Sequence, residues 1–388
     1  MFKIKRYNKV AEIGLKDFTK DKYTISDTEE NPDIILVRST PIHDEKFGDN
    51  LKVVTRIGAG VNTIPIDKLT SMGVCVFNCP GGNANAVKEL TIAAMIMEMR
   101  HGFTAMNWVK SLSDEDVAAG GAVEKGKEQF RGPEILGKTI GIIGLGAIGS
   151  IMARSCHALG LKVIGYDPYL GHAKTQELSQ YCHFVDDIND LYAVSDIVTV
   201  HIPLNEKNKG FIGAKEIAKM KDGVYLINYA RGPILDNDAV CDALDSGKLA
   251  GFATDFPTPR QLKRDDIIVT PHLASGSPEA EDNCSIMAAR QTIDYIENGN
   301  ITNSVNFPDI SFARAEGSRV CVIHENKVGM LGKMTDNVVS HGLNIENLVN
   351  KAKGAVAYTI MDFNETVPGK LSEDISKIDG VIRVRVID

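Results

Sequence analysis

The middle of the chain, from residue 139 onward, alternates short apolar runs with longer mixed segments. Apolar runs without polar alternation predict strands buried on both faces, and the mixed segments between them predict helices. Together they indicate a parallel sheet that helices cover on both sides. The predicted strands are Ile140–Ile143, Lys162–Tyr166, Ile197–His201, Tyr225–Asn228, Gly251–Thr254 and Ile267–Thr270.

The first 95 residues carry a looser pattern of short apolar runs separated by turns. Buried strands are predicted at Ile34–Val37 and Val74–Phe77. A helix is predicted at Val87–Met99, which is mostly apolar and contains no Pro or Gly. Residues 110–133 are polar and glycine-rich, which predicts a linking stretch.

The C-terminal region begins with a long helix predicted at Glu279–Asn298 and ended by Gly299. Residues 301–317, which include Pro308, predict a linker. Residues 318–388 then follow the ferredoxin-like order of strand, helix, strand, strand, helix, strand. The predicted strands are Ser318–His324, Asn344–Asn350, Ala355–Phe363 and Val381–Ile387, and the predicted helices are Gly329–Ser340 and Lys370–Lys377.

Length and charge narrow the class of protein. A chain of 388 residues is too long for one ordinary core, so two or three domains are expected. The net charge of −8 argues against a nucleic-acid partner, which requires a basic surface. No apolar run approaches the roughly 20 residues of a membrane span, and the first ten residues lack the apolar core of a signal peptide.

The seven cysteines are odd in number and scattered. Cys75 and Cys79 form the only close pair, and no second pair completes a zinc site. We therefore expect no metal, and reduced thiols in a cytoplasmic protein.

The sequence Gly144-Leu-Gly146-Ala-Ile-Gly149 matches the dinucleotide-binding pattern G-x-G-x-x-G. It follows a predicted strand and opens an apolar helix, which is the context that the Rossmann fold requires. The helix N-terminus offers free N–H groups to a pyrophosphate. Asp167 ends the next strand, where its carboxylate can accept hydrogen bonds from a ribose 2′-hydroxyl and would repel a 2′-phosphate. The predicted cofactor is NAD rather than NADP.

Several predicted strands end at a distinctive side chain, and in open α/β sheets ligands bind beyond these ends. Arg231 follows one strand, and its planar guanidinium suits a substrate carboxylate. His272 follows another, and imidazole can exchange a proton with a hydroxyl near neutral pH. Together with NAD, these groups fit hydride transfer at a small 2-hydroxy acid. The five strand-end residues are Asp167, His201, Arg231, Asp255 and His272.

These motifs resemble those of the D-isomer-specific 2-hydroxyacid dehydrogenase family, in the family's order. The matching segments are RIGAGV at 56–61, NAVKE at 85–89, GLGAIG at 144–149, Asp167, HIP at 201–203, NYARGPILD at 228–236, Asp255 and TPH at 270–272. The resemblance implies a flavodoxin-like substrate domain at 1–95 completed by the helix at 277–300. It further implies an NAD-binding domain at 96–276, a linker at 301–317 and a regulatory ACT domain at 318–388.

The resemblance also implies roles for single residues. Arg231 would orient the substrate carboxylate and His272 would act as acid and base. Asp255 would lie near the nicotinamide, and His201 and Pro203 would line the adenine side. The other residues expected at the cofactor are Gly144, Gly146, Ala147, Ile148, Gly149, Asp167 and Ala230.

Family members with an ACT domain imply 3-phosphoglycerate as the substrate and a role in serine synthesis. Its phosphate requires a second cation, for which Arg56 is the first choice and Arg38 the second. The backbone N–H groups of Gly58, Ala59 and Gly60 would meet the carboxylate. Asn85 would face the cleft between the domains, with a simple helix cap as the alternative.

In the ACT region, His324, Asn326 and Asn344 match positions that bind L-serine in relatives. Val328 replaces the usual Pro of this loop, and the alternative is an oligomerisation module without a ligand. Relatives pair through the cofactor domain and again through the ACT domain, which implies a homodimer or homotetramer.

Two departures and two alternatives remain. The family's Glu that pairs with the catalytic His is missing after Asp255, and Asp265 or Asp266 is its only nearby substitute. Ala147 stands where many relatives carry Arg, so the phosphates have one cation fewer. The alternative functions are a reductase of hydroxypyruvate, glyoxylate or 2-oxoglutarate, and a non-catalytic NAD-sensing protein.

Overall fold

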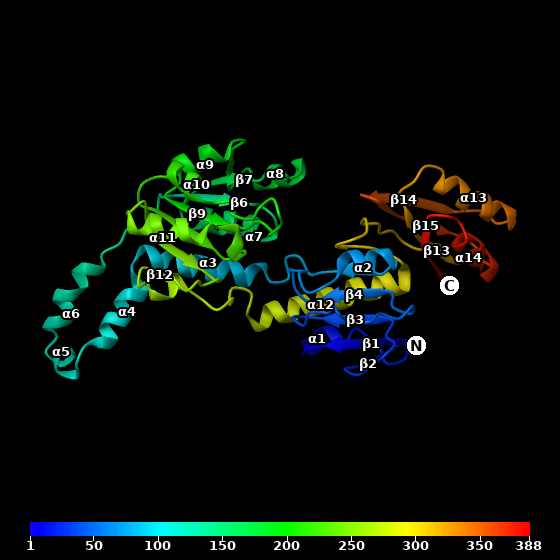
Figure 1. The fold of residues 1–388 in the computed structure, drawn as a ribbon, viewed down its shortest axis with the longest axis horizontal. Coiled ribbons are helices and arrows are strands. Elements are labelled where there is room, and N and C mark those ends of the chain that lie inside the picture. Colours follow the sequence, from blue (N-terminus) through cyan, green and yellow to red (C-terminus); the bar gives the residue numbers. More distant parts are fainter. The chain divides into compact units, whose positions relative to one another are not determined.

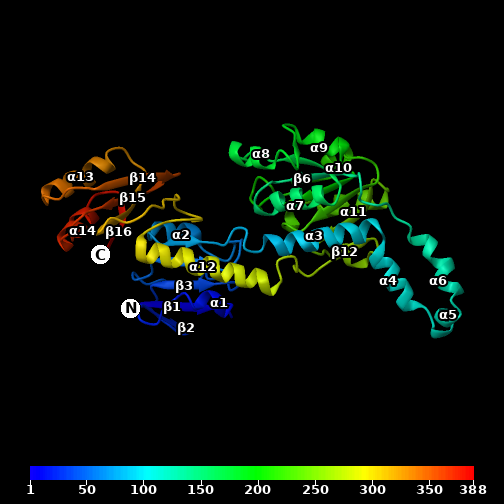
Figure 2. The same cartoon turned by 180° about the vertical axis from the view of Figure 1, so that it is seen from behind.

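The computed structural model describes all residues from Met1 to Asp388. The chain divides into two compact units, which are described separately below. The first comprises Met1–Asn83 and Pro278–Asp388, and the second comprises Ala84–Ser277. Figures 1 and 2 label their elements from opposite sides. None of the helices is both long and apolar enough to span a membrane.

The second unit is built on a seven-stranded, fully parallel sheet. Its strand order is β12-β11-β10-β9-β6-β7-β8. This arrangement is the Rossmann order, in which the first strand lies inside the sheet and the chain winds outward to both edges. The predicted doubly wound fold is confirmed. The strands are β6 (Thr139–Ile143), β7 (Lys162–Tyr166), β8 (His183–Phe184), β9 (Ile197–Val200), β10 (Val224–Asn228), β11 (Leu249–Thr254) and β12 (Ile267–Val269).

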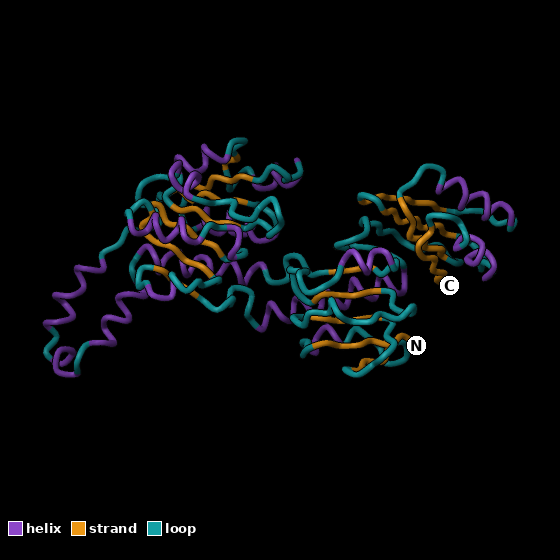
Figure 3. The backbone as a smooth tube through the Cα atoms, viewed as in Figure 1, coloured by secondary structure: helices purple, strands orange, loops and turns teal.

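Helices cover both faces of this sheet, as Figure 3 shows in purple. Alternate strand residues enter opposite cores, so that Ile142 packs with one set of helices and its neighbour Ile143 with the other. This explains why the strands are apolar throughout rather than alternating. One core uses α3 (Ala84–Met99) and α7 (Ala147–Ala158), and the other uses α9 (Ile188–Val194), α10 (Ala214–Lys219) and α11 (Asn237–Asp245). The helix α8 (His172–Leu178) contributes Leu178 to the core that contains α3 and α7.

The stretch at 110–133 is helical, so its prediction as a linking stretch is wrong. Figures 1 and 2 show α4, α5 and α6 extending away from the sheet. The polar and glycine residues here are helix ends: the Ser113 hydroxyl accepts from the Asp116 amide at 3.1 Å and begins α5. Gly120, with φ of 69°, separates α5 from α6. The elements are α4 (Gly102–Ser111), α5 (Asp114–Ala118), α6 (Gly121–Gly126) and the 3₁₀ turn Lys127–Phe130.

The first unit contains a five-stranded parallel sheet of order β2-β1-β3-β4-β5. This is the flavodoxin-like order, as predicted. The helix α12 (Pro278–Asn298) packs against α1 and β4, which places it with this sheet. The helix α3, by contrast, belongs to the second unit, so the division lies after Asn83 rather than at residue 95. The other elements are β1 (Phe2–Tyr7), α1 (Glu12–Leu15), β2 (Tyr23–Ser26), β3 (Ile34–Val37), β4 (Val53–Arg56), α2 (Ile66–Ser71) and β5 (Cys75–Phe77).

The C-terminal part of the first unit is a four-stranded antiparallel sheet of order β14-β15-β13-β16. Two helices pack against one face through an apolar core of their own. The predicted ferredoxin-like order is confirmed. The elements are β13 (Arg319–Glu325), α13 (Met330–Ser340), β14 (Asn347–Lys353), β15 (Val356–Asp362), α14 (Gly369–Ser376) and β16 (Val381–Ile387).

The segment at 301–317 packs against the rest of the unit rather than running free, in contrast to the linker expected there. Ile301, Phe307 and Ile310 are buried in the core that α12 shares with the five-stranded sheet. The side-chain oxygen of Asn306 accepts from the Val76 amide at 2.9 Å. Apolar residues at these spacings therefore anchor the segment.

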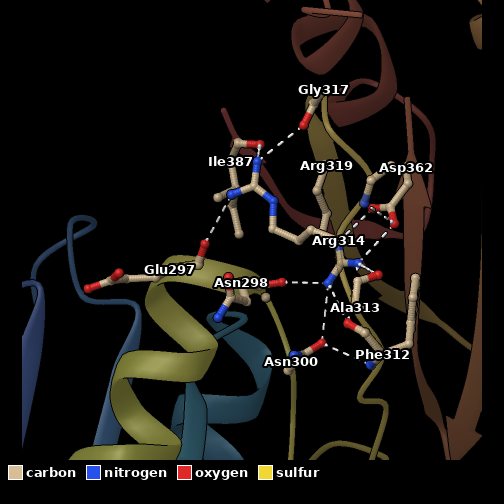
Figure 4. Close-up of polar contacts among 12 residues, drawn as sticks. Glu297, Asn298, Asn300, Phe312, Ala313, Arg314, Gly317, Arg319, Asp362 and Ile387 are labelled. Carbon is tan, nitrogen blue, oxygen red and sulfur yellow. Dashed lines mark hydrogen bonds and ion pairs between the residues drawn. The ribbon is translucent and has the colours of Figure 1, made fainter. Parts of the chain in front are cut away.

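Arg319 fastens the antiparallel sheet to the C-terminal end of α12 (Figure 4). Its guanidinium is fully buried and forms two hydrogen bonds with the Asp362 carboxylate, at 2.6 and 2.9 Å. It also donates to the carbonyl of Asn298, the last residue of α12, at 2.7 Å. The neighbouring Arg314 donates to the Glu297 carbonyl at 3.3 Å. Cations at this helix end complement its negative dipole.

Candidate active site

Because all strands of the seven-stranded sheet run parallel, their carboxyl ends meet at a single edge. The residues expected at the site follow these ends, so the sheet brings them to that edge. In spatial order they are His272 after β12, Asp255 after β11, Arg231 after β10, His201 after β9, the glycine turn after β6 and Asp167 after β7.

The glycine turn has the backbone that a dinucleotide requires. Gly144 has φ of 88°, and a Cβ there would lie 2.7 Å from the His201 carbonyl oxygen. A Cβ at Gly149 would lie 1.9 Å from the Gly144 carbonyl oxygen, so only glycine lets the helix approach the turn. Gly146 faces open space, with no atom within 4 Å of a Cβ placed there. The turn thus leaves room for a pyrophosphate.

The helix α7 begins directly after Gly146 and has no side-chain cap. The first N–H groups of a helix lack intrahelical acceptors, and they carry the positive end of the helix dipole. Ala147 and Ile148 occupy these first positions, and Ala147 is exposed. Such a helix start binds phosphate groups through the backbone alone, which fits an NAD pyrophosphate without an arginine at position 147.

Asp167 lies at the end of β7, beside the turn. Its Oδ2 accepts a hydrogen bond from the Leu145 amide at 2.9 Å, and its Oδ1 accepts from the Tyr169 amide at 3.0 Å. Each carboxylate oxygen can accept a further bond, and the residue is half-exposed. The carboxylate is therefore held in place while remaining open to a ribose hydroxyl.

His201 follows β9 next to the glycine turn. Its Nε2 lies 3.0 Å from the Thr199 hydroxyl, and its Nδ1 is buried without a hydrogen-bond partner. Burial lowers the pKa of His201 to about 4, so the ring is neutral at physiological pH. Pro203 is exposed two residues further on. A neutral ring and a proline offer an apolar wall.

Arg231 follows β10 in a turn that Asn228 stabilises. The Asn228 amide group donates to the Arg231 carbonyl at 2.9 Å and accepts from the Ala230 amide at 3.1 Å. The guanidinium is half-buried and donates one bond, to the Ala230 carbonyl at 2.7 Å. No carboxylate forms an ion pair with it, and burial lowers its pKa. A desolvated arginine without a counter-ion is suited to an anionic ligand.

His272 stands in a short loop that Asp255 organises. The Asp255 carboxylate is 1% exposed and accepts from the Thr270 hydroxyl, from the Leu273 amide at 2.7 Å and from the Ala274 amide at 2.8 Å. The Asp255 carbonyl oxygen accepts from the His272 amide at 3.0 Å. His272 has φ of 53°, an uncommon conformation that this network holds.

These contacts give Asp255 a positioning role that the sequence did not reveal. Both carboxylate oxygens are engaged by the loop, so the predicted contact with the nicotinamide stays a prediction. A signal was present in the sequence, because Asp255 and Thr270-Pro-His272 end adjacent strands.

A cavity of about 840 Å³ lies beside His272 in the second unit. Phe256 and Pro257 form part of its apolar wall, and Lys209, Asp236 and Asp238 contribute charge. The Phe256 and His272 rings are in contact, with centroids 4.9 Å apart. No motif in the sequence had singled out Phe256.

The predicted substrate residues of the first unit gather at the end of β4. The Arg56 guanidinium lies over Gly58, since a Cβ at Gly58 would fall 1.5 Å from its Nη1. Gly58 has φ of 141°. The turn is fixed from the neighbouring strand, where the Cys79 amide donates to the Gly58 carbonyl at 2.9 Å and Asn78 donates to the Ala59 carbonyl at 2.6 Å. The Ala59 and Gly60 amides have no acceptor within the chain, which suits an anion.

Arg38, the second candidate for the phosphate, follows β3 in the same sheet. Its guanidinium forms an ion pair with Glu281 of α12. Asn85 belongs to the other unit as the second residue of α3, where it donates to Glu89 at 2.8 Å. It is therefore inside the helix rather than at its N-cap.

The three residues expected to bind serine differ in accessibility. His324 is 2% exposed, with its Nδ1 2.7 Å from the Glu325 carbonyl oxygen and its Nε2 2.9 Å from the Thr359 hydroxyl. Both ring nitrogens are thus occupied within the domain, contrary to a role in direct ligand contact. Asn326 and Asn344 are exposed.

Comparisons with known proteins agree with this geometry. Residues 92–274 match the family model of the D-isomer specific 2-hydroxyacid dehydrogenase, NAD binding domain. D-3-phosphoglycerate dehydrogenase of Escherichia coli K12 is 33% identical over 345 residues, covering 84% of this chain and 79% of that protein. The enzyme of the same name from Archaeoglobus fulgidus is 35% identical over 286 residues, covering 71% of this chain and 52% of that protein.

Solved structures show the same fold. The NAD⁺-bound 3-phosphoglycerate dehydrogenase of Entamoeba histolytica superposes with a TM-score of 0.63 at 25% identity, covering 79% of this chain and 98% of that one. D-mandelate dehydrogenase of Rhodotorula graminis gives a TM-score of 0.69 at 21% identity, covering 80% and 99%.

The fold and the cofactor edge thus define a D-isomer-specific 2-hydroxyacid dehydrogenase that uses NAD. Within this class, the chain belongs to the D-3-phosphoglycerate dehydrogenase family.

Proposed function

We propose that the protein oxidises D-3-phosphoglycerate to 3-phosphohydroxypyruvate with NAD⁺, the first step of serine synthesis. The observation that carries the proposal is Arg231, a half-buried guanidinium without a carboxylate partner at the same sheet edge as His272 and the glycine turn. Relatives that are 32–33% identical over 84% of this chain bear the name of this activity.

The reaction requires the removal of a hydride and a proton from one alcohol carbon. NAD⁺, when bound, accepts the hydride. Arg231 binds the substrate carboxylate with its free donors and orients the carbon that loses the hydride. His272 accepts the hydroxyl proton as the C–O bond becomes a carbonyl, and returns it in the reverse direction. Asp255 keeps the His272 loop in place through the Thr270, Leu273 and Ala274 contacts.

The cofactor is held by the glycine turn and Asp167. The amides of Ala147 and Ile148 bind the pyrophosphate, and Asp167 accepts from the ribose. His201, Pro203 and Ala230 line the nucleotide. For the substrate phosphate, Arg56 is the first candidate, and Arg38, which forms an ion pair with Glu281, is the second. The family resemblance also assigns the amides of Ala59 and Gly60 to the substrate carboxylate and Asn85 to the substrate.

The test measures NADH formation with 3-phosphoglycerate, and NADH consumption with hydroxypyruvate, glyoxylate and 2-oxoglutarate. We expect the highest kcat/KM with 3-phosphoglycerate. Arg231→Lys and His272→Gln should each lower it by about 100-fold or more, because a clamp or a base is lost. Arg260→Lys, whose ion pairs with Asp242 and Asp245 lie on the surface, is the control.

Wild-type turnover in both site variants would refute the catalytic assignment. A preference for an unphosphorylated 2-oxo acid would favour the reductase alternative. NAD binding without turnover on any of these compounds would favour a non-catalytic sensor.

We further propose a homo-oligomer that binds L-serine at the exposed Asn326 and Asn344 of the ACT domain, with His324 supporting them from the interior. The alternative is an oligomerisation module without a ligand. All seven cysteines of the chain are free thiols, which supports our proposal of a cytoplasmic location. Sedimentation velocity tests the assembly, and a monomer would refute it. A serine titration tests the serine site, and an unchanged catalytic rate and melting temperature would refute it.

A further inference from the structure

Phe256 is the residue that covers the His272 ring. It follows Asp255 directly after β11, and its ring centroid lies 4.9 Å from that of His272, with the planes at 55°. The contact is within the unit that contains the dinucleotide turn. It forms one wall of the cavity beside His272.

We propose that Phe256 is a positioning residue of the catalytic histidine, which fixes the imidazole and favours its protonated form during proton transfer. This inference rests on the proposed role of His272 as the base. Asp255 is followed by Phe256, Pro257, Thr258 and Pro259, with no Glu among them.

The physical basis is the charge distribution of the aromatic ring. A phenyl face is electron-rich, and it attracts a cation whose charge lies within about 6 Å of the ring centroid. The imidazole gains positive charge as it takes the substrate proton, so the ring stabilises the later stage of the transfer more than the start. Such differential stabilisation is what accelerates a reaction.

The backbone holds Phe256 in this place. Its amide donates to the Thr254 hydroxyl at 3.1 Å. On its other side, a Cβ at Gly232 would come within 2.9 Å of the Phe256 Cβ. The glycine after Arg231 therefore permits the ring to pack here, and the His272 contact is part of a defined arrangement rather than a chance encounter of side chains.

Charged groups around His272 act in a different way from Phe256. The Asp255 carboxylate oxygens accept hydrogen bonds from the loop that carries His272. Asp236 accepts from the α11 amides, and Asp238 lies 3.8 Å from Arg260.

Two cations, Arg231 and Lys209, lie on the turn after β10 and on the cavity wall. The Tyr229 hydroxyl, whose pKa burial raises to about 12, stays neutral. Salt screens the exposed charges but not a ring in contact, so ionic strength separates the two contributions.

The experiment compares Phe256→Leu, which keeps apolar volume, with Phe256→Tyr, which keeps the ring. Phe184→Leu, on β8 at the opposite edge of the same sheet, is the matched control. The His272 ring is titrated in the full-length protein by NMR, with His272→Gln identifying its signal. The pH dependence of kcat/KM for 3-phosphoglycerate is measured at low and high salt.

In Phe256→Leu, we expect the His272 midpoint to fall by about 0.5 pH unit, equivalent to about 0.7 kcal/mol, at both salt concentrations. The kcat should fall about threefold with KM unchanged. Phe256→Tyr and Phe184→Leu should leave the midpoint where it is in the wild type.

An unchanged midpoint in a folded Phe256→Leu protein would overturn the inference, as would an equal shift in Phe256→Tyr. Circular dichroism identifies a misfolded variant, in which case the tyrosine variant still decides whether a ring suffices. A shifted NMR midpoint in a protein without turnover would leave the ring contact standing and refute the proposed function alone.

Discussion

Replacing Arg319 with methionine should unfold the C-terminal sheet at a much lower temperature. The guanidinium is fully buried, and its hydrogen bonds go to the Asp362 carboxylate and to the carbonyl groups of Asn298, Phe312 and Ala313. Methionine keeps the apolar stem but donates none of these bonds. The variant therefore leaves a carboxylate that is 1% exposed without its cation.

The expected loss of stability follows from the cost of leaving the buried Asp362 carboxylate unpaired. Removing one partner of a buried ion pair typically costs about 3–5 kcal/mol. The remaining contact to Asp362, from the Ala315 amide at 3.4 Å, is too long to compensate. For a unit of this size, about 4 kcal/mol corresponds to a fall in melting temperature of roughly 10 °C.

Calorimetry combined with fluorescence can locate the effect. Trp108, the only tryptophan of the chain, lies on α4 in the other unit. We expect the calorimetric transition of the unit that contains Arg319 to shift, while the fluorescence transition of Trp108 stays in place. Arg6→Met, which breaks an exposed pair with Asp27 in the same unit, should change stability by less than about 1 kcal/mol.

A double substitution tests the reasoning itself. Arg319→Met with Asp362→Leu removes both charges, so the loss should be at least about 2 kcal/mol smaller than the sum of the single losses. If the two losses add, or if Arg319→Met melts like the wild type, the buried pair does not hold this junction and the argument fails.

Three further predictions concern the other parts of the chain. Burial raises the pKa of Glu98 to about 8. The contribution of Glu98 to stability is therefore full below about pH 4.5 and is lost as the pH rises to 8. Glu98→Gln should melt at a higher temperature than the wild type at pH 8.5 but not at pH 4.5, as followed by Trp108 fluorescence. Asp167→Ser should lower kcat/KM for NAD⁺ by about tenfold to 100-fold and raise the NADP⁺ to NAD⁺ ratio, because a hydrogen-bond acceptor and a negative charge are lost. Asp255→Asn should lower kcat while changing KM less, because the His272 loop is freed. Hydrogen exchange at the Leu273 and Ala274 amides should become faster.

Six strands of the seven-stranded sheet and two of the five-stranded sheet were predicted, because these strands are mostly continuous apolar runs. For these strands the predicted and observed ends agree within a few residues, and they coincide at Lys162–Tyr166. The segment at 110–133 shows the limit. Its Ser and Gly residues cap short helices, and a capping residue looks the same in sequence as a turn residue.

The placement of the site was also predictable, since parallel strands bring their carboxyl ends together whatever their order. The order of the strands in the sheet could not be predicted from the local sequence pattern, and neither could the ion pair between Arg38 and Glu281. That ion pair joins residues far apart in the chain, so no spacing in the sequence predicts it. The same holds for the contact between Phe256 and His272.

Arg231 and Asp255 show what decides whether a strand-end residue serves a ligand or the fold. They follow neighbouring strands of one sheet, and Asp255 is buried while Arg231 is half-buried. Asp255 has accepted three hydrogen bonds from its own loop, so its charge is already compensated. Arg231 uses one bond of the five donors that a guanidinium offers. A desolvated charge that the chain leaves unpaired lowers its free energy most by binding an external counter-ion, and the counter-ion that we propose at this edge of the sheet is the substrate carboxylate.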